Sequence, residues 1–222
     1  MPRYLAKCAA DLPANPRGAL GAFAVTVPMG TTAVAKDAFR DCAGLAQVTL
    51  PATVTVIEAG PAGGGIVGAF SGCSSLSEIA LPPNLTEIGG HAFHECTSLT
   101  KITLPSNLTK IGGSTFYGCT SLSEIALPPN LTKIGDSAFC KCTSLSEIAL
   151  PPNLTKIGDA AFSWCTSLSK ITLPPNLTEI GDAAFFCCRS LTKITLPVGP
   201  VHIGSCAFYG CPGMPRSLWA RP

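Results

Sequence analysis

Cysteine is the residue whose number and spacing most suggest chemistry in this chain of 222 residues. The chain has 12 cysteines, and eight of them share one repeat position: Cys42, Cys73, Cys96, Cys119, Cys142, Cys165, Cys188 and Cys211. Equivalent residues on adjacent strands lie about 4.8 Å apart, but their Cβ atoms point in parallel instead of converging as a disulfide requires. We therefore expect these eight to be unpaired, small buried hydrophobic residues. Cys140, Cys187 and Cys206 fall elsewhere in the repeat, where we expect more exposed and more reactive thiols.

Other combinations that could bind a metal or support catalysis are weaker. His91, His94 and Cys96 are close in sequence, but the two histidines take different repeat positions and no other copy has either of them. Cys140 and Cys142 together form at most half of a tetrahedral zinc site. The chain has neither a phosphate-binding loop nor a Ser-His-Asp arrangement. The sequence thus predicts no catalytic residue, no metal site and no cofactor, and therefore no enzyme.

An N-L-T triplet recurs at one repeat position and is formally an acceptor for N-glycosylation. Its asparagines are Asn84, Asn107, Asn130, Asn153 and Asn176. Five triplets at one position also follow from duplication of a single turn, and Asn is favoured in turns. We expect these side chains to hydrogen-bond the backbone of the neighbouring layer, and glycosylation stays open.

All of these residues are positioned by a 23-residue repeat with the pattern L-x-x-I-x-L-P-x-N-L-T-x-I-G-x-x-A-F-x-x-C-x-x. Six regular copies begin at residues 76, 99, 122, 145, 168 and 191, and two divergent copies begin at residues 22 and 45. The second divergent copy carries a Gly- and Pro-rich insertion at about residues 58–68. We divide the chain into an N-terminal cap or flanking segment (1–21), one repeat array (22–213) and a C-terminal tail (214–222).

Each copy predicts two short strands and a turn. The apolar residues of L-x-x-I-x-L point one way from an extended segment, and Leu85 and Ile88 form a second one. Ala92, Phe93 and Cys96 suit a single helical turn that faces inward. One copy cannot bury these groups alone, so neighbouring copies must stack. We predict an α/β fold: a strand-dominated solenoid, horseshoe or rod, of eight repeats with parallel β ladders and short helical turns.

The string L-x-x-I-x-L-x-x-N, as in residues 122–130, resembles the leucine-rich-repeat consensus. The 23-residue period and the I-G-x-x-A-F-x-x-C half resemble the BspA-like subclass of that family, over residues 22–213. The resemblance implies a leucine-rich-repeat solenoid that serves protein–protein or cell-surface recognition, without catalytic residues. Members of this subclass are commonly surface or adhesion proteins of bacteria and single-celled eukaryotes.

Composition excludes several other classes of protein. The formal net charge is +2, and only 13% of the residues are charged. Because no long basic run occurs, we expect no nucleic-acid binding. No stretch of 18 apolar residues occurs, so we expect no membrane span. The 46% share of hydrophobic residues argues against charge-driven disorder.

The positions that vary most between copies are the two residues after the repeated Phe. In the six regular copies they read HE, YG, CK, SW, FC and YG. We expect them to line one edge of the solenoid, which we call the aromatic edge: His94, Tyr117, Lys141, Trp164, Phe186 and Tyr209. Exposed aromatic residues are favoured at binding hot spots. The aromatic edge is therefore either a partner-binding surface or a solvated row under weak constraint.

A second candidate surface is a charged row at the third repeat position: Glu78, Lys101, Glu124, Glu147, Lys170 and Lys193. Three of its five neighbouring pairs are opposite in sign, which supports pairing between adjacent strands. Small neighbouring residues leave this face flat, so the charged row is either an ordinary soluble face or the floor of a concave binding surface. Lys110, Lys133 and Lys156 form a basic stripe on the other ladder, where a solvated surface is expected.

The main hypothesis for function is a non-enzymatic recognition scaffold, of adhesion type, that binds a protein partner or, alternatively, a surface glycan. The competing hypothesis is a structural protein that self-associates through uncapped ends. We expect an intracellular location in preference to the cell surface or secretion, because no clear signal peptide is found and the cysteine ladder is predicted to be unpaired.

Overall fold

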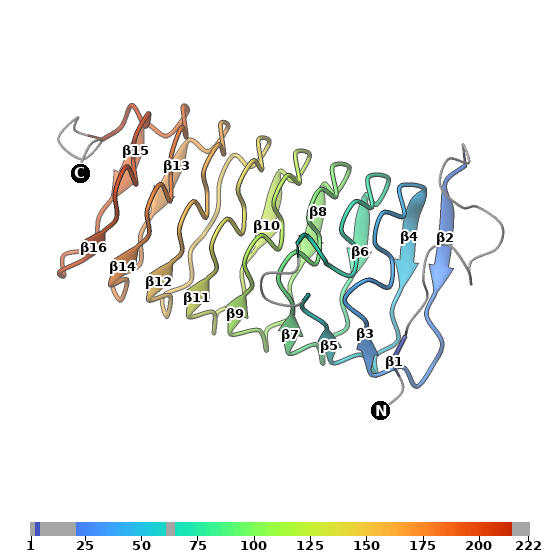
Figure 1. Ribbon diagram of the computed structural model, residues 1–222. Coiled ribbons are helices and arrows are strands. Elements are labelled where there is room, and N and C mark those ends of the chain that lie inside the picture. The colour runs from blue at the N-terminus through green and yellow to red at the C-terminus, as the bar shows by residue number, and fades with distance from the viewer. Residues whose placement is uncertain (1–2, 5–20, 61–64, 215–222) are drawn as a thin grey trace.

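The computed structural model describes residues 3–4, 21–60 and 65–214, and the chain forms an elongated β-solenoid of about eight turns (Figure 1). Two ladders of short strands run along it. The first ladder consists of β2 (Phe23–Thr26), β4 (Leu45–Thr49), β6 (Glu78–Ala80), β8 (Lys101–Thr103), β10 (Glu124–Ala126), β13 (Lys170–Thr172) and β15 (Lys193–Thr195). The second consists of β1 (Arg3–Tyr4), β3 (Ala33–Val34), β5 (Val56–Ile57), β7 (Glu87–Ile88), β9 (Lys110–Ile111), β11 (Lys133–Ile134), β12 (Lys156–Ile157), β14 (Glu179–Ile180) and β16 (His202–Ile203).

Strands of neighbouring layers pair in parallel, so the repeat period sets the register. Ile79 of β6 lies beside Ile102 of β8, and Glu78 lies beside Lys101. The layer between β10 and β13 joins the first ladder through a single parallel bridge, Glu147 to Lys170. The central residue of β6, β8, β10 and β13 is buried while its two neighbours are exposed. This alternation confirms the predicted solenoid of parallel ladders with an apolar interior.

A column of eight phenylalanine rings occupies the interior along the axis: Phe39, Phe70, Phe93, Phe116, Phe139, Phe162, Phe185 and Phe208. All eight are fully buried. Centroids of consecutive rings lie 5.1–5.5 Å apart, and their planes agree within 11°. Rings at this separation gain dispersion and exclude water, so the column links every layer to the next.

The cysteine ladder runs beside this column. The thiol of Cys142 donates to the carbonyl oxygen of Phe116 in the preceding layer at 3.1 Å. Counting this one, seven ladder cysteines make the same contact, at 3.0–3.1 Å. Burial raises the pKa of Cys119 to about 12, which keeps its thiol protonated as a donor. The seven ladder cysteines from Cys73 to Cys211 are unpaired, which confirms the prediction for them.

Cys42, the eighth ladder position, is disulfide-bonded, and the prediction was wrong there. Parallel Cβ atoms disfavour a disulfide only between equivalent cysteines of adjacent layers. Cys42 belongs to the first copy of the array, so an equivalent residue faces it on one side only. The expectation of exposed thiols at Cys140 and Cys187 was also wrong, because both side chains are buried. Cys206 is half-buried.

The segment around each Phe is a run of tight turns, and the structure assigns no helix to any residue it describes. The predicted helical turn is therefore not confirmed. The residue two after each Phe has a positive φ: Asp41, Gly72, Glu95, Gly118, Lys141, Trp164, Cys187 and Gly210, between 56° and 77°. Such residues interrupt a right-handed helix. The backbone instead bonds to the next layer, as in Phe139 N–H to Ala161 O at 2.8 Å.

Four of the five asparagines of the N-L-T triplets also bond between layers. The side-chain amide of Asn176 donates to Pro152 O at 3.0 Å, and Asn84, Asn107 and Asn153 make the same kind of contact at 3.3–3.4 Å. This supports the structural role expected of these turns.

The inserted segment leaves the array within the copy that begins at residue 45. An antiparallel bridge joins Ala59 to Gly68 at its base. At the chain ends, β1 pairs with β3, and Met214 is buried. The rest of the predicted N-terminal cap and C-terminal tail lies outside the described residues.

Candidate functional site

The aromatic edge divides into two clusters. In the first, the rings of His94 and Tyr117 are stacked, with centroids 4.7 Å apart and planes within 6°. The ammonium group of Lys141, from the next layer, lies 5.1 Å from the centroid of the Tyr117 ring. Contact between a cation and a ring face is favourable also at exposed sites. The Tyr117 ring is therefore held between His94 and Lys141.

The second cluster contains Trp164, Phe186 and Tyr209. Phe186 stacks on Tyr209 at 5.3 Å and meets Trp164 at 6.1 Å with a tilt of 55°. The guanidinium carbon of Arg189 lies 5.6 Å from the centroid of the Trp164 ring. Trp164 is 39% exposed and Tyr209 is 45% exposed, which makes them two of the six large hydrophobic residues that the described surface exposes.

The sequence predicted one exposed row, and the structure differs in two ways. His94 is buried, and Tyr117 and Phe186 are half-buried. Cys140 and Ser163, both buried, separate the two clusters. The reason is that the edge uses two adjacent repeat positions. The residue directly after Phe packs against its layer neighbours, whereas Lys141 and Trp164 stand one position further and project outward.

Arg189 contacts the aromatic edge through Trp164 but was not expected there from the sequence. We include it in the aromatic edge from here on. It occupies the repeat position that holds Thr97, Thr120, Thr143 and Thr166 in four other copies. Three of these threonines bond to the preceding layer, as in Thr143 Oγ1 to Thr120 O at 3.3 Å. The replacement of this Thr by Arg was the signal available in the sequence.

The charged row lies on the outer face of the first strand ladder. All six residues are exposed. Pairing places Glu78 beside Lys101 and Lys101 beside Glu124, and Lys101 Nζ lies 3.5 Å from Glu124 Oε1. Glu147 lies beside Lys170, and Lys170 beside Lys193. An exposed ion pair of this kind contributes little to stability, typically about 0–1 kcal/mol.

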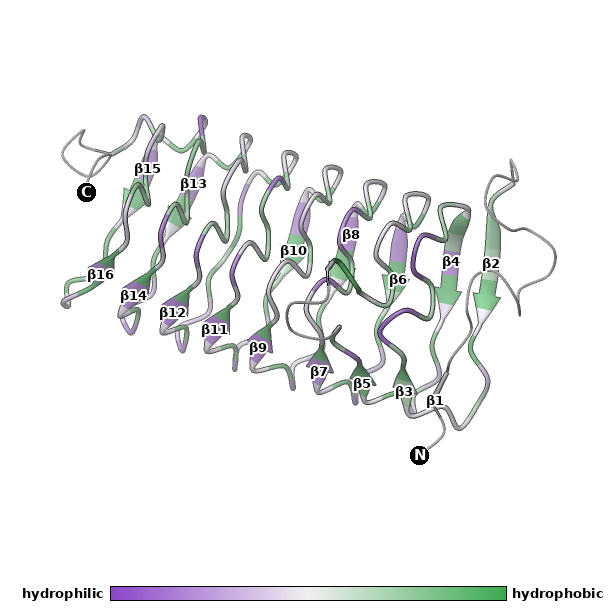
Figure 2. Ribbon diagram, in the orientation of Figure 1, coloured by the Kyte–Doolittle hydropathy of each residue, from purple (hydrophilic) through white to green (hydrophobic). Residues whose placement is uncertain are grey.

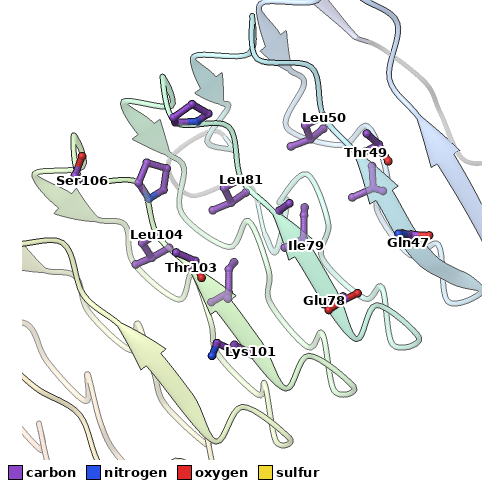
Figure 3. Close-up of a pocket in the computed structure, with 15 residues that line it drawn as sticks. Gln47, Thr49, Leu50, Glu78, Ile79, Leu81, Lys101, Thr103, Leu104 and Ser106 are labelled. Atoms are coloured by element: carbon purple, nitrogen blue, oxygen red, sulfur yellow. The ribbon is translucent and has the colours of Figure 1, made fainter.

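A groove of about 670 Å³ crosses this face over β4, β6 and β8. Figure 3 shows Gln47, Glu78 and Lys101 at one end of it and Leu50, Leu81 and Leu104 at the other. Small side chains between the two ends, such as Thr103, keep its floor low. The charged residues of this face, and a concave binding surface as one alternative, were expected from the sequence, whereas the apolar end of the groove was not.

The basic stripe lies on the second ladder, where β9, β11, β12 and β14 carry hydrophilic residues (Figure 2). Lys133 pairs with Lys110 on one side and Lys156 on the other. Lys156 Nζ lies 2.5 Å from Glu179 Oε1, so one end of the stripe is neutralised. We assign no function to it.

Histidines and cysteines are the groups of the described residues most suited to holding a metal. No cluster of three or more His, Cys, Asp or Glu residues in this part of the chain could hold a metal ion. His91 and His94 lie close together, with centroids 5.6 Å apart, and burial lowers the pKa of both. The described portion also contains no helix with the length and apolarity needed to cross a membrane.

Comparison with known proteins identifies the repeat. Six copies of the family described as BspA type Leucine rich repeat region match residues 23–61, 66–159 and 132–216. The leucine rich repeat protein TpLRR of T. pallidum is 31% identical, with a TM-score of 0.59, over 89% of this chain and 80% of that chain. A leucine rich cell surface protein of Faecalibacterium prausnitzii is 29% identical, with a TM-score of 0.56, over 88% of this chain and 61% of that one.

A leucine-rich repeat protein of Eubacterium ventriosum has a TM-score of 0.52 at 26% identity, over 85% of this chain and 43% of that one. No curated protein matches the chain. Nothing in these comparisons supports the expected intracellular location. The family matches cover most of the chain, and the resemblance noted in the sequence is confirmed. The chain belongs to the BspA-type leucine-rich-repeat family.

Proposed function

We propose that this chain is a non-enzymatic recognition scaffold at the cell surface that binds a protein partner through the aromatic edge. Family membership supports a scaffold for protein recognition in general. The choice of the aromatic edge rests on Trp164, a large exposed aromatic residue held in place by its neighbours. Residues of this kind dominate the energetics of protein interfaces.

The backbone at Trp164 strengthens this choice. Trp164 has a φ of 61°, at the repeat position where three other copies carry glycine: Gly72, Gly118 and Gly210. A left-handed conformation costs a non-glycine residue about 1–2 kcal/mol. Trp164 thus occupies a position where glycine would serve the fold better. Four other copies also carry a non-glycine residue there, so the strain supports the aromatic edge only together with the exposure of Trp164.

A cell-surface location is supported by the Faecalibacterium prausnitzii relative, which is described as a cell surface protein. The disulfide at Cys42 agrees with it, because disulfides persist in oxidising compartments. The unpaired cysteine ladder is compatible with export as well. Its thiols are buried, and burial raises the pKa of those such as Cys119 and Cys165, so they react slowly.

The test compares two variants that use residues from other copies of the repeat. A partner captured on the wild-type chain from a surface extract of the source organism is titrated against Trp164→Gly/Tyr209→Ser, which removes the exposed rings. The matched control is Glu78→Lys/Lys101→Glu, which exchanges two charges in the groove and leaves the net charge unchanged. We expect the edge variant to bind at least about tenfold more weakly and the control to bind normally. Full affinity in the edge variant would rule out the aromatic edge.

The groove over β4, β6 and β8 is the second candidate for the binding site. Its apolar end and its charged end give a segment of a partner protein two distinct contacts. If Glu78→Lys/Lys101→Glu loses affinity for the partner and Trp164→Gly/Tyr209→Ser keeps it, the groove is the binding site.

Self-association is favoured by one observation only. Ile194 and Ile203 in the last layer are half-buried, whereas the equivalent Ile171 and Ile180 one layer inward are buried. Light scattering over a concentration series tests it, because end-to-end stacking makes the apparent mass rise with concentration.

A further inference from the structure

The charges along the aromatic edge are distributed unevenly. In the copies before Tyr117, the position two after Phe holds the acidic residues Asp41 and Glu95. In later copies the edge holds Lys141 and Arg189, and both are exposed. Among the described residues, none of the edge positions after Glu95 is acidic.

The acidic residues three before Phe, such as Asp136 and Asp159, are engaged elsewhere. Asp136 and Asp159 use a carboxylate oxygen to accept the backbone N–H of the next layer, at 3.1 and 2.9 Å. Both contribute to the electrostatic environment of Lys156, on the second ladder. Lys141 is influenced instead by Tyr117, Cys140 and Glu95, so Glu95 is the acidic residue that bears on it. The half of the edge that contains Trp164 therefore keeps a surplus of positive charge.

Several aromatic contacts of the edge are made within the protein. Tyr117 stacks on His94 and carries Lys141 over its ring, and Arg189 lies over the Trp164 ring. Phe186 meets Trp164 at a tilt of 55°, and Trp164 remains 39% exposed. A partner that binds here therefore meets the exposed part of Trp164 together with two cations. The edge of an aromatic ring carries partial positive charge, which adds to the charge of these cations.

We infer that the partner presents an acidic polypeptide segment that lies along Tyr117, Lys141, Trp164 and Arg189. The inference rests on the proposed function and specifies the chemistry of its partner. The two cations are already held over ring faces, so they lose little side-chain freedom when a carboxylate binds. Carboxylates of the partner would pair with Lys141 and Arg189, and its apolar side chains would contact the exposed edge of Trp164.

The test uses three labelled ten-residue peptides and fluorescence anisotropy. The first alternates Glu and Leu, the second alternates Gln and Leu, and the third alternates Lys and Leu. We expect the Glu peptide to bind the wild-type chain at least about tenfold more tightly than the other two, and its affinity to fall as salt is added. Equal binding of the Glu and Gln peptides, or no binding of the Glu peptide, would overturn the inference.

Two variants locate the binding. Lys141→Gly/Arg189→Thr removes both cations and installs residues that other copies carry at these positions. Lys170→Glu is the matched control, since it lowers the net charge by the same two units on the strand face. We expect the first variant to lose binding of the Glu peptide and the second to retain it, with thermal unfolding as the check that both fold. Equal loss in both variants would mean that net charge alone attracts the peptide.

Failure of this inference can be distinguished from failure of the proposed function. If the captured partner binds Lys141→Gly/Arg189→Thr normally but binds Trp164→Gly/Tyr209→Ser weakly, the aromatic edge is the binding site and the partner is not acidic. If it binds both variants normally, the proposed function fails together with the inference.

Discussion

Two adjacent rows of residues in this protein behave in opposite ways. The Phe column repeats one residue through eight layers, with every ring buried. The two positions that follow it carry His, Tyr, Trp, Lys, Gly and other residues, and they range from buried, as at His94, to exposed, as at Trp164. The backbone hydrogen bonds nevertheless recur from layer to layer in both rows, as in Phe139 N–H to Ala161 O and Lys141 N–H to Ser163 O. Packing in the interior thus fixes residue identity, while hydrogen bonding between layers fixes only the path of the chain.

The largest difference between the rows should appear on truncation. Phe139 stacks on Phe116 and Phe162 at 5.3 Å on either side. We expect Phe139→Ala to lower the free energy of unfolding by about 3–5 kcal/mol, because it opens a cavity in a close-packed column. Tyr117→Ala, one layer away on the aromatic edge, should cost less than about 1.5 kcal/mol. Urea denaturation measures both, and similar losses would contradict the distinction between the rows.

The cysteine ladder provides an intermediate case. Cys142 is fully buried, and its thiol donates to Phe116 O at 3.1 Å. We expect Cys142→Ala to cost about 1–2 kcal/mol, from the lost hydrogen bond and the lost apolar contact. Cys206→Ala, at a half-buried position outside the ladder, should change stability much less in the same denaturation experiment. A cost at Cys142 no greater than that at Cys206 would show that the ladder does not contribute to stability.

Glycine usually makes a protein less stable than alanine at the same position, and backbone strain at Trp164 should reverse this order. Because φ is 61°, we expect Trp164→Gly to be more stable than Trp164→Ala by about 1 kcal/mol. Both variants lose the same contacts with Phe186 and Arg189, so their difference isolates the backbone. At exposed Ser144, which lacks a positive φ, alanine should equal or exceed glycine in stability. Thermal melts of the four variants provide the comparison, and an alanine advantage at 164 would exclude strain.

The smallest expected effect depends on pH. Burial is the main cause that lowers the pKa of His94 below 6.5, with further effects from Glu95, His91 and Lys141. A histidine with a lowered folded-state pKa is protonated more readily in the unfolded chain. Its stabilising contribution is therefore present above pH 6.5 and is lost as the pH falls from 6.5 toward the folded-state value. His94→Tyr, with the residue found at positions 117 and 209, should lose less stability than wild type between pH 7.5 and 5. If the free energies of unfolding of wild type and His94→Tyr fall in parallel over this pH range, His94 does not cause the loss of stability.

The 23-residue period was enough to predict the layers, the parallel ladders and the inward direction of residues such as Ile79. It could not predict the form of the turns, because Lys141 and Trp164 adopt positive φ through bonds to neighbouring layers and not through local preference. The charged row could be found from the sequence alone. The contacts of Arg189 and the burial of His94 could not, because they depend on which side chains of adjacent layers meet.

The insertion after residue 57 illustrates what a stacked architecture permits. The bridge between Ala59 and Gly68 brings the start and the end of the extra segment together, so the layers beyond it keep their alignment. Gly68 is needed at this neck, since a Cβ there would lie 1.8 Å from the carbonyl oxygen of His91. The length of polypeptide beyond the neck is thereby uncoupled from the array. We therefore expect this site to accept a grafted loop or a foreign module while the rest of the scaffold stays unchanged.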